Sequence, residues 1–115
     1  NGNGIAANPK EAFKYFKLAA IKGNAFAMYN IAVMLEIGNG ISSNMHEAVK
    51  YYKMAADNGF LMGMYTFGLM LEKGHGVPVN IKEAIRYYKM AADEGEINSI
   101  YKYNQLSKIY SFFLD

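Results

Sequence analysis

Apolar and polar positions along the 115-residue chain recur with a period of 36 residues. Segments 38–59 and 74–95 align without a gap, and a partial third copy precedes them. The positions that recur three times include the glycine pairs Gly2–Gly4, Gly38–Gly40 and Gly74–Gly76 and the closing glycines Gly23, Gly59 and Gly95. A period of this length is typical of helical repeat arrays, whose units bury their apolar faces against one another. The pattern therefore predicts an all-α stack of similar helical units.

Each unit is expected to contain two helices, and the second, helix B, begins behind an asparagine. Asn44 precedes Glu47 by three residues, as Asn8 and Asn80 precede their own glutamates. This is the spacing of a capping box, in which the asparagine accepts a backbone hydrogen bond and the glutamate reaches back. Pro9 suits the first helical position. We expect helix B over 45–58, ended by a left-handed Gly59.

The first helix of each unit, helix A, is predicted over 25–37 and again over 61–73. At about 100° per residue, one face of each helix collects apolar and small residues. These are Ala27, Met28, Ile31, Ala32, Met34 and Leu35 in one copy and Gly63, Met64, Phe67, Gly68, Met70 and Leu71 in the other. We expect both faces to be buried, with the small residues allowing neighbouring helices to approach closely.

The last copy of helix A departs from this pattern. Asn104 stands where the other copies have Ala32 and Gly68, and Ser107 replaces a core leucine. Terminal units of an array are atypical because one side faces water. We interpret Asn98 to Phe113 as a longer capping helix. The chain is then one array, 1–115, with helix B of a partial repeat at 8–23, repeats at 24–59 and 60–95, and a degenerate cap at 96–115.

Composition narrows the functional classes. The chain has no cysteine, a net charge of +2 and 52% hydrophobic residues. Disulfides, thiolate metal sites and cysteine nucleophiles are therefore excluded. No apolar run reaches the roughly 18 to 20 residues of a membrane span. The chain opens at Asn1 without a methionine, and we interpret it as a fragment of a longer protein.

Candidate catalytic or cofactor-binding residues are few. The strings G-N-G-I and G-H-G-V lack the Gly-Lys-Ser/Thr of a phosphate-binding loop and follow a helix, so they are interpreted as turns. The two histidines, His46 and His75, lie in different units without metal-ligand spacing. No serine has a recurring histidine partner. The sequence predicts no enzyme, no cofactor and no metal.

Helix B carries a row of basic residues on its outward face. The row comprises His46, Lys50 and Lys53 in one unit and, at matching positions, Lys10, Lys14, Lys17, Lys82, Arg86 and Lys89. Stacked units would align this basic ridge, which could meet nucleic acid or an acidic partner. Carboxylates on the same helices favour the simpler interpretation, a solvated helix face. Tyr52 and Tyr88 are expected to point inward, beside Ala48 and Ala84.

The repeated segments have a recognisable counterpart among known families. The strings A-M-Y-N-I-A-V-M-L-E-I-G-N-G-I and E-A-V-K-Y-Y-K-M-A-A-D-N-G resemble the Sel-1-like repeat family, relatives of the tetratricopeptide repeats. The resemblance implies a right-handed superhelix, or solenoid, of helix-turn-helix repeats with helix A lining a concave groove. It also implies an adaptor of protein complexes without shared chemistry.

The outer face of helix A is the candidate binding surface. It mixes apolar side chains with polar ones, as a peptide groove requires. The predicted groove residues are Phe26, Tyr29, Asn30, Val33 and Ile37 in one unit and Met62, Tyr65, Thr66, Leu69 and Lys73 in the next. Glu36 and Glu72 flank them. Burial of these residues by neighbouring repeats is the competing interpretation.

The predicted function is a protein–protein interaction scaffold or adaptor that holds a peptide or partner protein within a larger multi-subunit complex. One alternative is an RNA-binding helical repeat that uses the basic ridge, although nucleic acid is the less favoured partner. A second is an adaptor of endoplasmic-reticulum quality control. A third is a structural spacer with an empty groove.

Overall fold

The computed structural model describes residues 8–38 and 43–111, which form an all-α solenoid. The described residues contain six helices of thirteen residues each and no strand. The helices are α2 (Pro9–Ile21), α3 (Ala25–Ile37), α4 (Met45–Asp57), α5 (Leu61–Lys73), α6 (Ile81–Asp93) and α7 (Ile97–Ile109). Helix A of successive units corresponds to α3, α5 and α7, and helix B corresponds to α2, α4 and α6.

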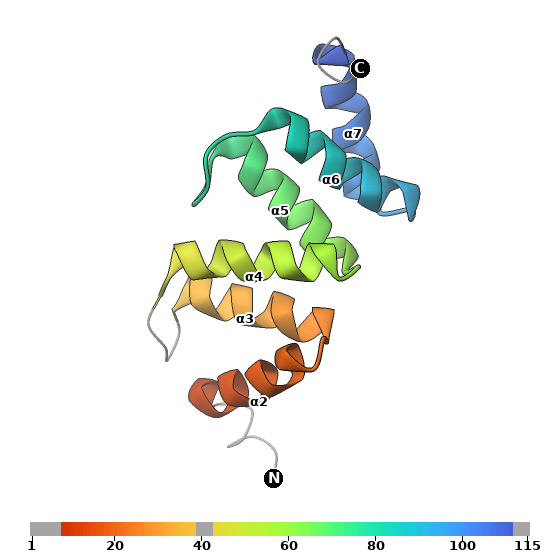
Figure 1. The fold of residues 1–115 in the computed structure, drawn as a ribbon. Coiled ribbons are helices and arrows are strands. Elements are labelled where there is room, and N and C mark those ends of the chain that lie inside the picture. Colours follow the sequence, from red (N-terminus) through yellow and green to blue (C-terminus); the bar gives the residue numbers. More distant parts are fainter. Residues whose placement is uncertain (1–7, 39–42, 112–115) are drawn as a thin grey trace.

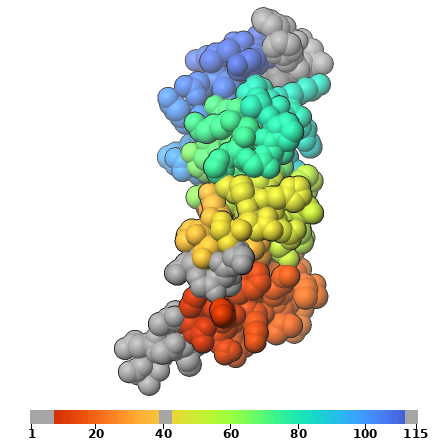
Figure 2. Space-filling model, turned by 90° about the vertical axis from the view of Figure 1, so that its left-hand side faces the viewer, coloured from red at the N-terminus to blue at the C-terminus, as the bar shows by residue number. Residues whose placement is uncertain are grey.

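The helices stack in chain order, with α2 and α7 at opposite ends of the stack (Figure 1). Each helix packs chiefly on the helix before it and the helix after it. The molecule is accordingly elongated, with principal dimensions of 54 × 26 × 23 Å, and the space-filling view shows the units as successive bands (Figure 2). A side chain therefore meets mainly residues of its own unit and of the adjacent ones.

The predicted boundaries of α3 and α5 and the predicted start of α4 are confirmed, and so is half of the predicted capping box. The Asn44 side chain accepts a hydrogen bond from the backbone N–H of Glu47 at 3.0 Å, and Asn8 and Asn80 make the same contact. The other half, a hydrogen bond from the asparagine backbone N–H to the glutamate side chain, is not formed at Asn44 and Asn80. Their backbone N–H groups donate instead to carbonyls at the end of the preceding helix A, those of Leu35 and Leu71, at 2.8 Å. The cap thus also ties helix B to helix A.

Glycines end the helices as expected. Gly59 has φ 93°, in the left-handed region that side chains with a Cβ avoid, and it lies just beyond α4. Gly74 ends α5 with φ 73°. The turn interpretation of the G-x-G motif is confirmed for Gly74 and Gly76, whereas Gly2, Gly4 and Gly40 lie outside the described residues.

The apolar faces of helix A form most of the core. All six predicted positions of α5 are buried, as are five of six in α3; Met34, at the edge of its face, is only half-buried. Tyr52 and Tyr88 point inward as predicted. A Cβ at Gly68 would lie 2.6 Å from Cε1 of Tyr88, which explains why this position is a glycine.

The last helix is shorter than the sequence suggested. The expectation of a longer capping helix is wrong, because α7 ends at Ile109, where Tyr110 leaves the helical conformation. Phe113 lies outside the described residues. Asn104 is exposed, since no following helix covers it among the described residues, and Leu106 supplies the core contact.

None of the helices in 8–38 and 43–111 has the length and apolar character required to cross a bilayer.

Candidate binding groove

The ten predicted groove residues differ in exposure. Four of them are exposed: Phe26, Ile37, Met62 and Lys73. Ile37 is 67% exposed and Phe26 56%. The other six are half-buried, namely Tyr29, Asn30, Val33, Tyr65, Thr66 and Leu69. The outer face of helix A is therefore open at its apolar ends and partly covered in between.

The half-buried residues fix helix A to helix B. The Tyr29 ring lies 5.4 Å from the Tyr52 ring and 5.0 Å from the Phe60 ring, distances typical of aromatic packing. Val33 and Leu69 pack against the hydrophobic core. These two residues of the predicted groove are therefore only partly available to a partner.

A pocket of about 180 Å³ opens between consecutive copies of helix A. It is lined by Glu36 from the end of α3, by Thr66, Leu69, Met70 and Lys73 from α5, and by His75 from the following turn. Three predicted groove residues thus come together there. Phe26 does not join them, since its ring lies against Phe60 at 5.7 Å. Asn30 turns back to donate to the Phe26 carbonyl at 2.9 Å.

Glu36, which the sequence predicts only at the flank of the groove, lines the pocket. Its carboxylate also accepts a hydrogen bond that has an equivalent in the next unit. The Tyr52 hydroxyl donates to Oε1 of Glu36 at 2.6 Å, and the Tyr88 hydroxyl donates to Oε1 of Glu72 at 2.7 Å. Burial and these hydrogen bonds to carboxylates raise the pKa of both tyrosines well above its ordinary value. The glutamate–tyrosine spacing of sixteen residues, which occurs in both units, is the sequence signal for this contact.

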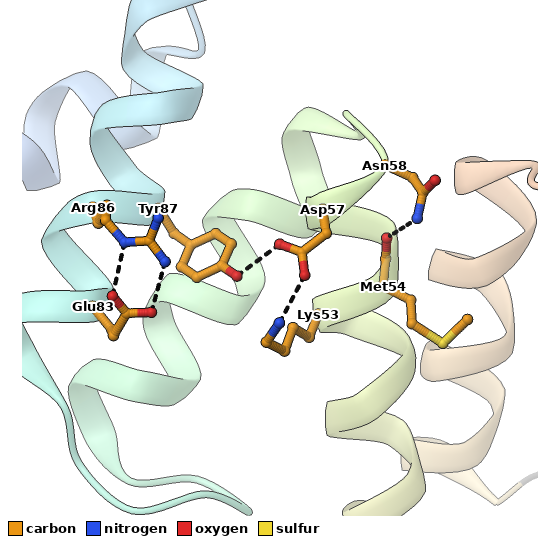
Figure 3. A network of polar contacts seen from close by, with 7 residues as sticks. All are labelled: Lys53, Met54, Asp57, Asn58, Glu83, Arg86 and Tyr87. Carbon is orange, nitrogen blue, oxygen red and sulfur yellow. Dashed lines mark hydrogen bonds and ion pairs between the residues drawn. The ribbon is translucent and has the colours of Figure 1, made fainter.

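A second polar network joins helix B of the two complete units (Figure 3). Asp57 of α4 accepts a hydrogen bond from Lys53 at 2.7 Å and another from the Tyr87 hydroxyl of α6 at 2.7 Å. Burial and, to a smaller extent, the hydrogen bond to Asp57 raise the pKa of Tyr87 to about 12. Desolvation opposes ionisation of Asp57, but these two hydrogen bonds outweigh it and lower the pKa of this carboxyl.

Four of the eight lysine and arginine residues of the basic ridge pair with carboxylates of their own helices. Lys53 pairs with Asp57, Lys50 with Glu47 at 3.7 Å, Arg86 with Glu83 at 2.7 Å and Lys89 with Asp93 at 3.0 Å. The hydrogen bond from Arg86 lowers the pKa of Glu83, so this carboxylate stays ionised. Such pairs reduce the positive potential that a nucleic acid would meet. This agrees with a solvated helix face.

Two other kinds of candidate site are a metal site and a second pocket. Within 8–38 and 43–111, no three histidine, aspartate or glutamate side chains converge as metal ligands would. A hollow of about 420 Å³, lined by Ile81, Lys82, Ile85 and Tyr110, lies at the C-terminal end. Its counterpart one unit earlier is filled by the turn at Gly76, where a Cβ would lie 2.8 Å from Met45 and Val49.

Comparison with family models agrees with the observed period. The model described as Sel1 repeat matches residues 1–24, 25–60 and 61–96, which together cover most of the chain. Among curated proteins, none matches.

Three of the solved structures with the same architecture come from bacteria. A Sel1 repeat protein of Oxalobacter formigenes is 34% identical with a TM-score of 0.80, over 84% of this chain and 40% of that one. A protective antigen of uropathogenic Escherichia coli with an SLR fold is 34% identical with a TM-score of 0.81, over 99% of this chain and 24% of that one. Cysteine-rich protein B of Helicobacter pylori shares the fold at 22% identity and a TM-score of 0.78, over 81% of this chain and 70% of that one. The chain thus spans less than half the length of the first two.

Proposed function

The chain belongs to the Sel1 repeat family, and on this premise we propose that it is a non-enzymatic scaffold that holds an extended segment of a partner protein along α3 and α5. Sel1 repeats are helical scaffolds that generally serve protein–protein interaction. More specifically, the partner binds to the outer face of helix A, and the scaffold acts within a larger complex.

The observation that supports this surface is the combination of exposed apolar residues and a polar-edged pocket on one face. Ile37, Phe26 and Met62 are large apolar side chains left in water, and the pocket at Glu36 and Thr66 lies between the two helices that carry them. Interfaces use such apolar anchors for affinity and polar groups for orientation. The face therefore offers both elements of peptide recognition.

The basic ridge offers less to a partner. Four of its cations already hold carboxylates of their own helices, so binding there would exchange existing ion pairs for new ones. Exposed pairs of this kind are worth roughly 1 kcal/mol or less, and the exchange would add little affinity. An RNA-binding role would instead show an affinity that falls steeply with salt.

The test is a selection of short random peptides displayed on phage, followed by binding measurements on two double variants. Ile37→Asp with Met62→Asp places charges on the exposed anchors, and we expect selected peptides to lose at least about tenfold in affinity. Lys50→Glu with Lys53→Glu reverses the ridge charge, and we expect binding within about threefold. Circular dichroism checks that both variants fold.

The anchors in this test were chosen for their exposure, because Val33 and Leu69 pack against the core and aspartate there would also cost stability. Peptides that bind the groove variant normally but lose affinity on the ridge variant would contradict the proposal. Binding of single-stranded RNA with a steep salt dependence would favour the alternative.

A further inference from the structure

The two copies of the pocket glutamate have different surroundings. Oε1 of Glu72 accepts a hydrogen bond from the Tyr88 hydroxyl, and the Lys102 ammonium lies 3.1 Å from Oε1 and 3.2 Å from Oε2. Lys102 comes from α7, thirty residues further along the chain, and its side chain is only 18% exposed. This junction therefore contains a carboxylate satisfied by one phenol and one largely covered ammonium.

One repeat earlier, the ammonium is missing. The position of Lys102 is occupied by Thr66, whose side chain is too short to reach, whereas Glu36 and Tyr52 match Glu72 and Tyr88. The pocket of about 180 Å³ opens beside Thr66. Its carboxylate is 37% exposed, against 17% for Glu72.

Among residues 8–38 and 43–111, the one basic group that lies within 4.0 Å of the Glu36 carboxylate is the His75 imidazole. His75 Nε2 lies 3.9 Å from Oε2, beyond hydrogen-bond distance. Lys73 lines the pocket, yet among the described residues it makes no ion pair with Glu36 within 4.0 Å. The carboxylate thus retains an oxygen that can accept a strong hydrogen bond.

We infer that the Glu36 pocket binds a cationic side chain, lysine or arginine, supplied by the partner segment that lies in the proposed groove. The inference rests on the proposed function and adds the chemistry of one partner residue. The incoming ammonium or guanidinium takes the place that Lys102 takes at Glu72, and it donates to Oε2 of Glu36 in a charge-assisted hydrogen bond.

The lining suits such a side chain along its whole length. Leu69 and Met70 provide an apolar wall for the methylene stem, while Glu36 receives the charged end. An acidic side chain in the same place would bring a second negative charge against the Glu36 carboxylate, which opposes its binding. An apolar side chain would bury that carboxylate without a partner for its free oxygen.

The test is an NMR titration of the isotope-labelled chain with N-acetyl-lysine methylamide. We expect saturable shifts at Thr66, Leu69 and His75. The norleucine analogue, which has the same stem without the ammonium, should bind about tenfold more weakly. Glu36→Gln should weaken the lysine probe by a similar factor. Thr66→Lys should abolish its binding, because the new side chain fills the pocket from within.

The matched control is a gain of function in the next unit. Lys102→Thr should open the equivalent pocket at Glu72 and add a second set of saturable shifts around that residue. Dispersed amide signals confirm folding of each variant. Equal binding of the two probes, or no saturable shift with the lysine probe, would overturn the inference.

Failure of this site would be distinguishable from failure of the groove. If the groove proposal holds without the cationic site, selected peptides lose affinity with Ile37→Asp and Met62→Asp but not with Glu36→Gln. If the groove itself is wrong, the selected peptides tolerate all of these variants.

Discussion

Tyr51 and Tyr87 occupy the same position in two nearly identical helices, but their environments differ. Both open the string Y-Y-K-M-A-A-D, in α4 and α6 respectively. Tyr87 is only 2% exposed and donates its hydroxyl to Asp57. Tyr51 is half-buried and makes no side-chain hydrogen bond with any residue of 8–38 and 43–111. The difference comes from the preceding unit, where the residue that matches Asp57 is Ile21.

The rest of the network is already present around Tyr51. Lys17, which matches Lys53 in the repeat, lies over the Tyr51 ring with its Nζ 6.0 Å from the centroid. Only the carboxylate that would join the two is missing. In a repeat array, the environment of a side chain is set jointly by its own unit and the neighbouring unit. Identical local sequences can therefore contribute unequally to stability.

The largest effect should come from removing the two rings. Tyr87→Ala should lower the free energy of unfolding by about 4 kcal/mol, because it leaves a cavity beside Phe67 and deprives Asp57 of a donor. Tyr51→Ala should cost about 2 kcal/mol, since part of that ring already faces solvent. Urea denaturation of both variants measures the difference. Equal losses would show that the unequal environments have no energetic consequence.

The buried environment of Tyr87 should also make the stability of the protein depend on high pH, with a somewhat smaller effect than removal of the ring. Burial and the bond to Asp57 raise the pKa of Tyr87 from 10.0 to about 12, so the folded state favours the neutral phenol. This stabilisation is fully present below pH 10 and is lost as pH rises through 12, at a cost of roughly 3 kcal/mol.

Thermal melts from pH 8 to pH 12 test this, with Tyr87→Phe as the control that cannot ionise. The wild-type chain should lose more stability than the control over this range. Tyr52 and Tyr88, whose pKa values are also raised, contribute equally to both proteins. Parallel losses in the two proteins would mean that Tyr87 ionises as readily in the folded state as in the unfolded one.

At neutral pH, removing only the hydroxyl groups should have a moderate effect. Tyr87→Phe should cost about 1.5 kcal/mol, because the lost hydrogen bond is made to a charged carboxylate. Tyr51→Phe should change stability by less than about 0.5 kcal/mol. The measurement is again urea denaturation. A cost for Tyr51→Phe equal to that for Tyr87→Phe would imply a partner for Tyr51 that the structure does not contain.

The smallest effect should sharpen the comparison most. Ile21→Asp places a carboxylate at the position that matches Asp57, within the range of Lys17 and Tyr51. A double-mutant cycle with Tyr51→Phe should give a coupling free energy of about 0.5 to 1 kcal/mol, typical of a half-exposed charged hydrogen bond. Ile21→Asn serves as the uncharged control. Coupling indistinguishable from zero would show that a carboxylate at position 21 of α2 does not reach Tyr51 as Asp57 of α4 reaches Tyr87.

Much of the fold could be predicted because it depends on short-range spacing. Asn44 and Glu47 are three residues apart, so the cap could be recognised locally, and Gly59 marks the end of the same helix. The groove could be predicted less well. Val33 and Leu69 lie on the outer face of a helical wheel, but a wheel contains no neighbouring helix, and in the structure both residues pack against the hydrophobic core.

The sequence by itself determined the period, which is visible as a direct repeat, and it determined the limits of α3 and α5 and the buried stripe of helix A, because these follow from residues close together in the chain. Only the tertiary structure decided that Tyr87 meets Asp57, that Lys102 covers Glu72 and that a pocket remains beside Glu36. The first two contacts join residues thirty positions apart on different units. These contacts depend on the distance between two stacked helices and on the length of a side chain. The repeat period specifies neither of them.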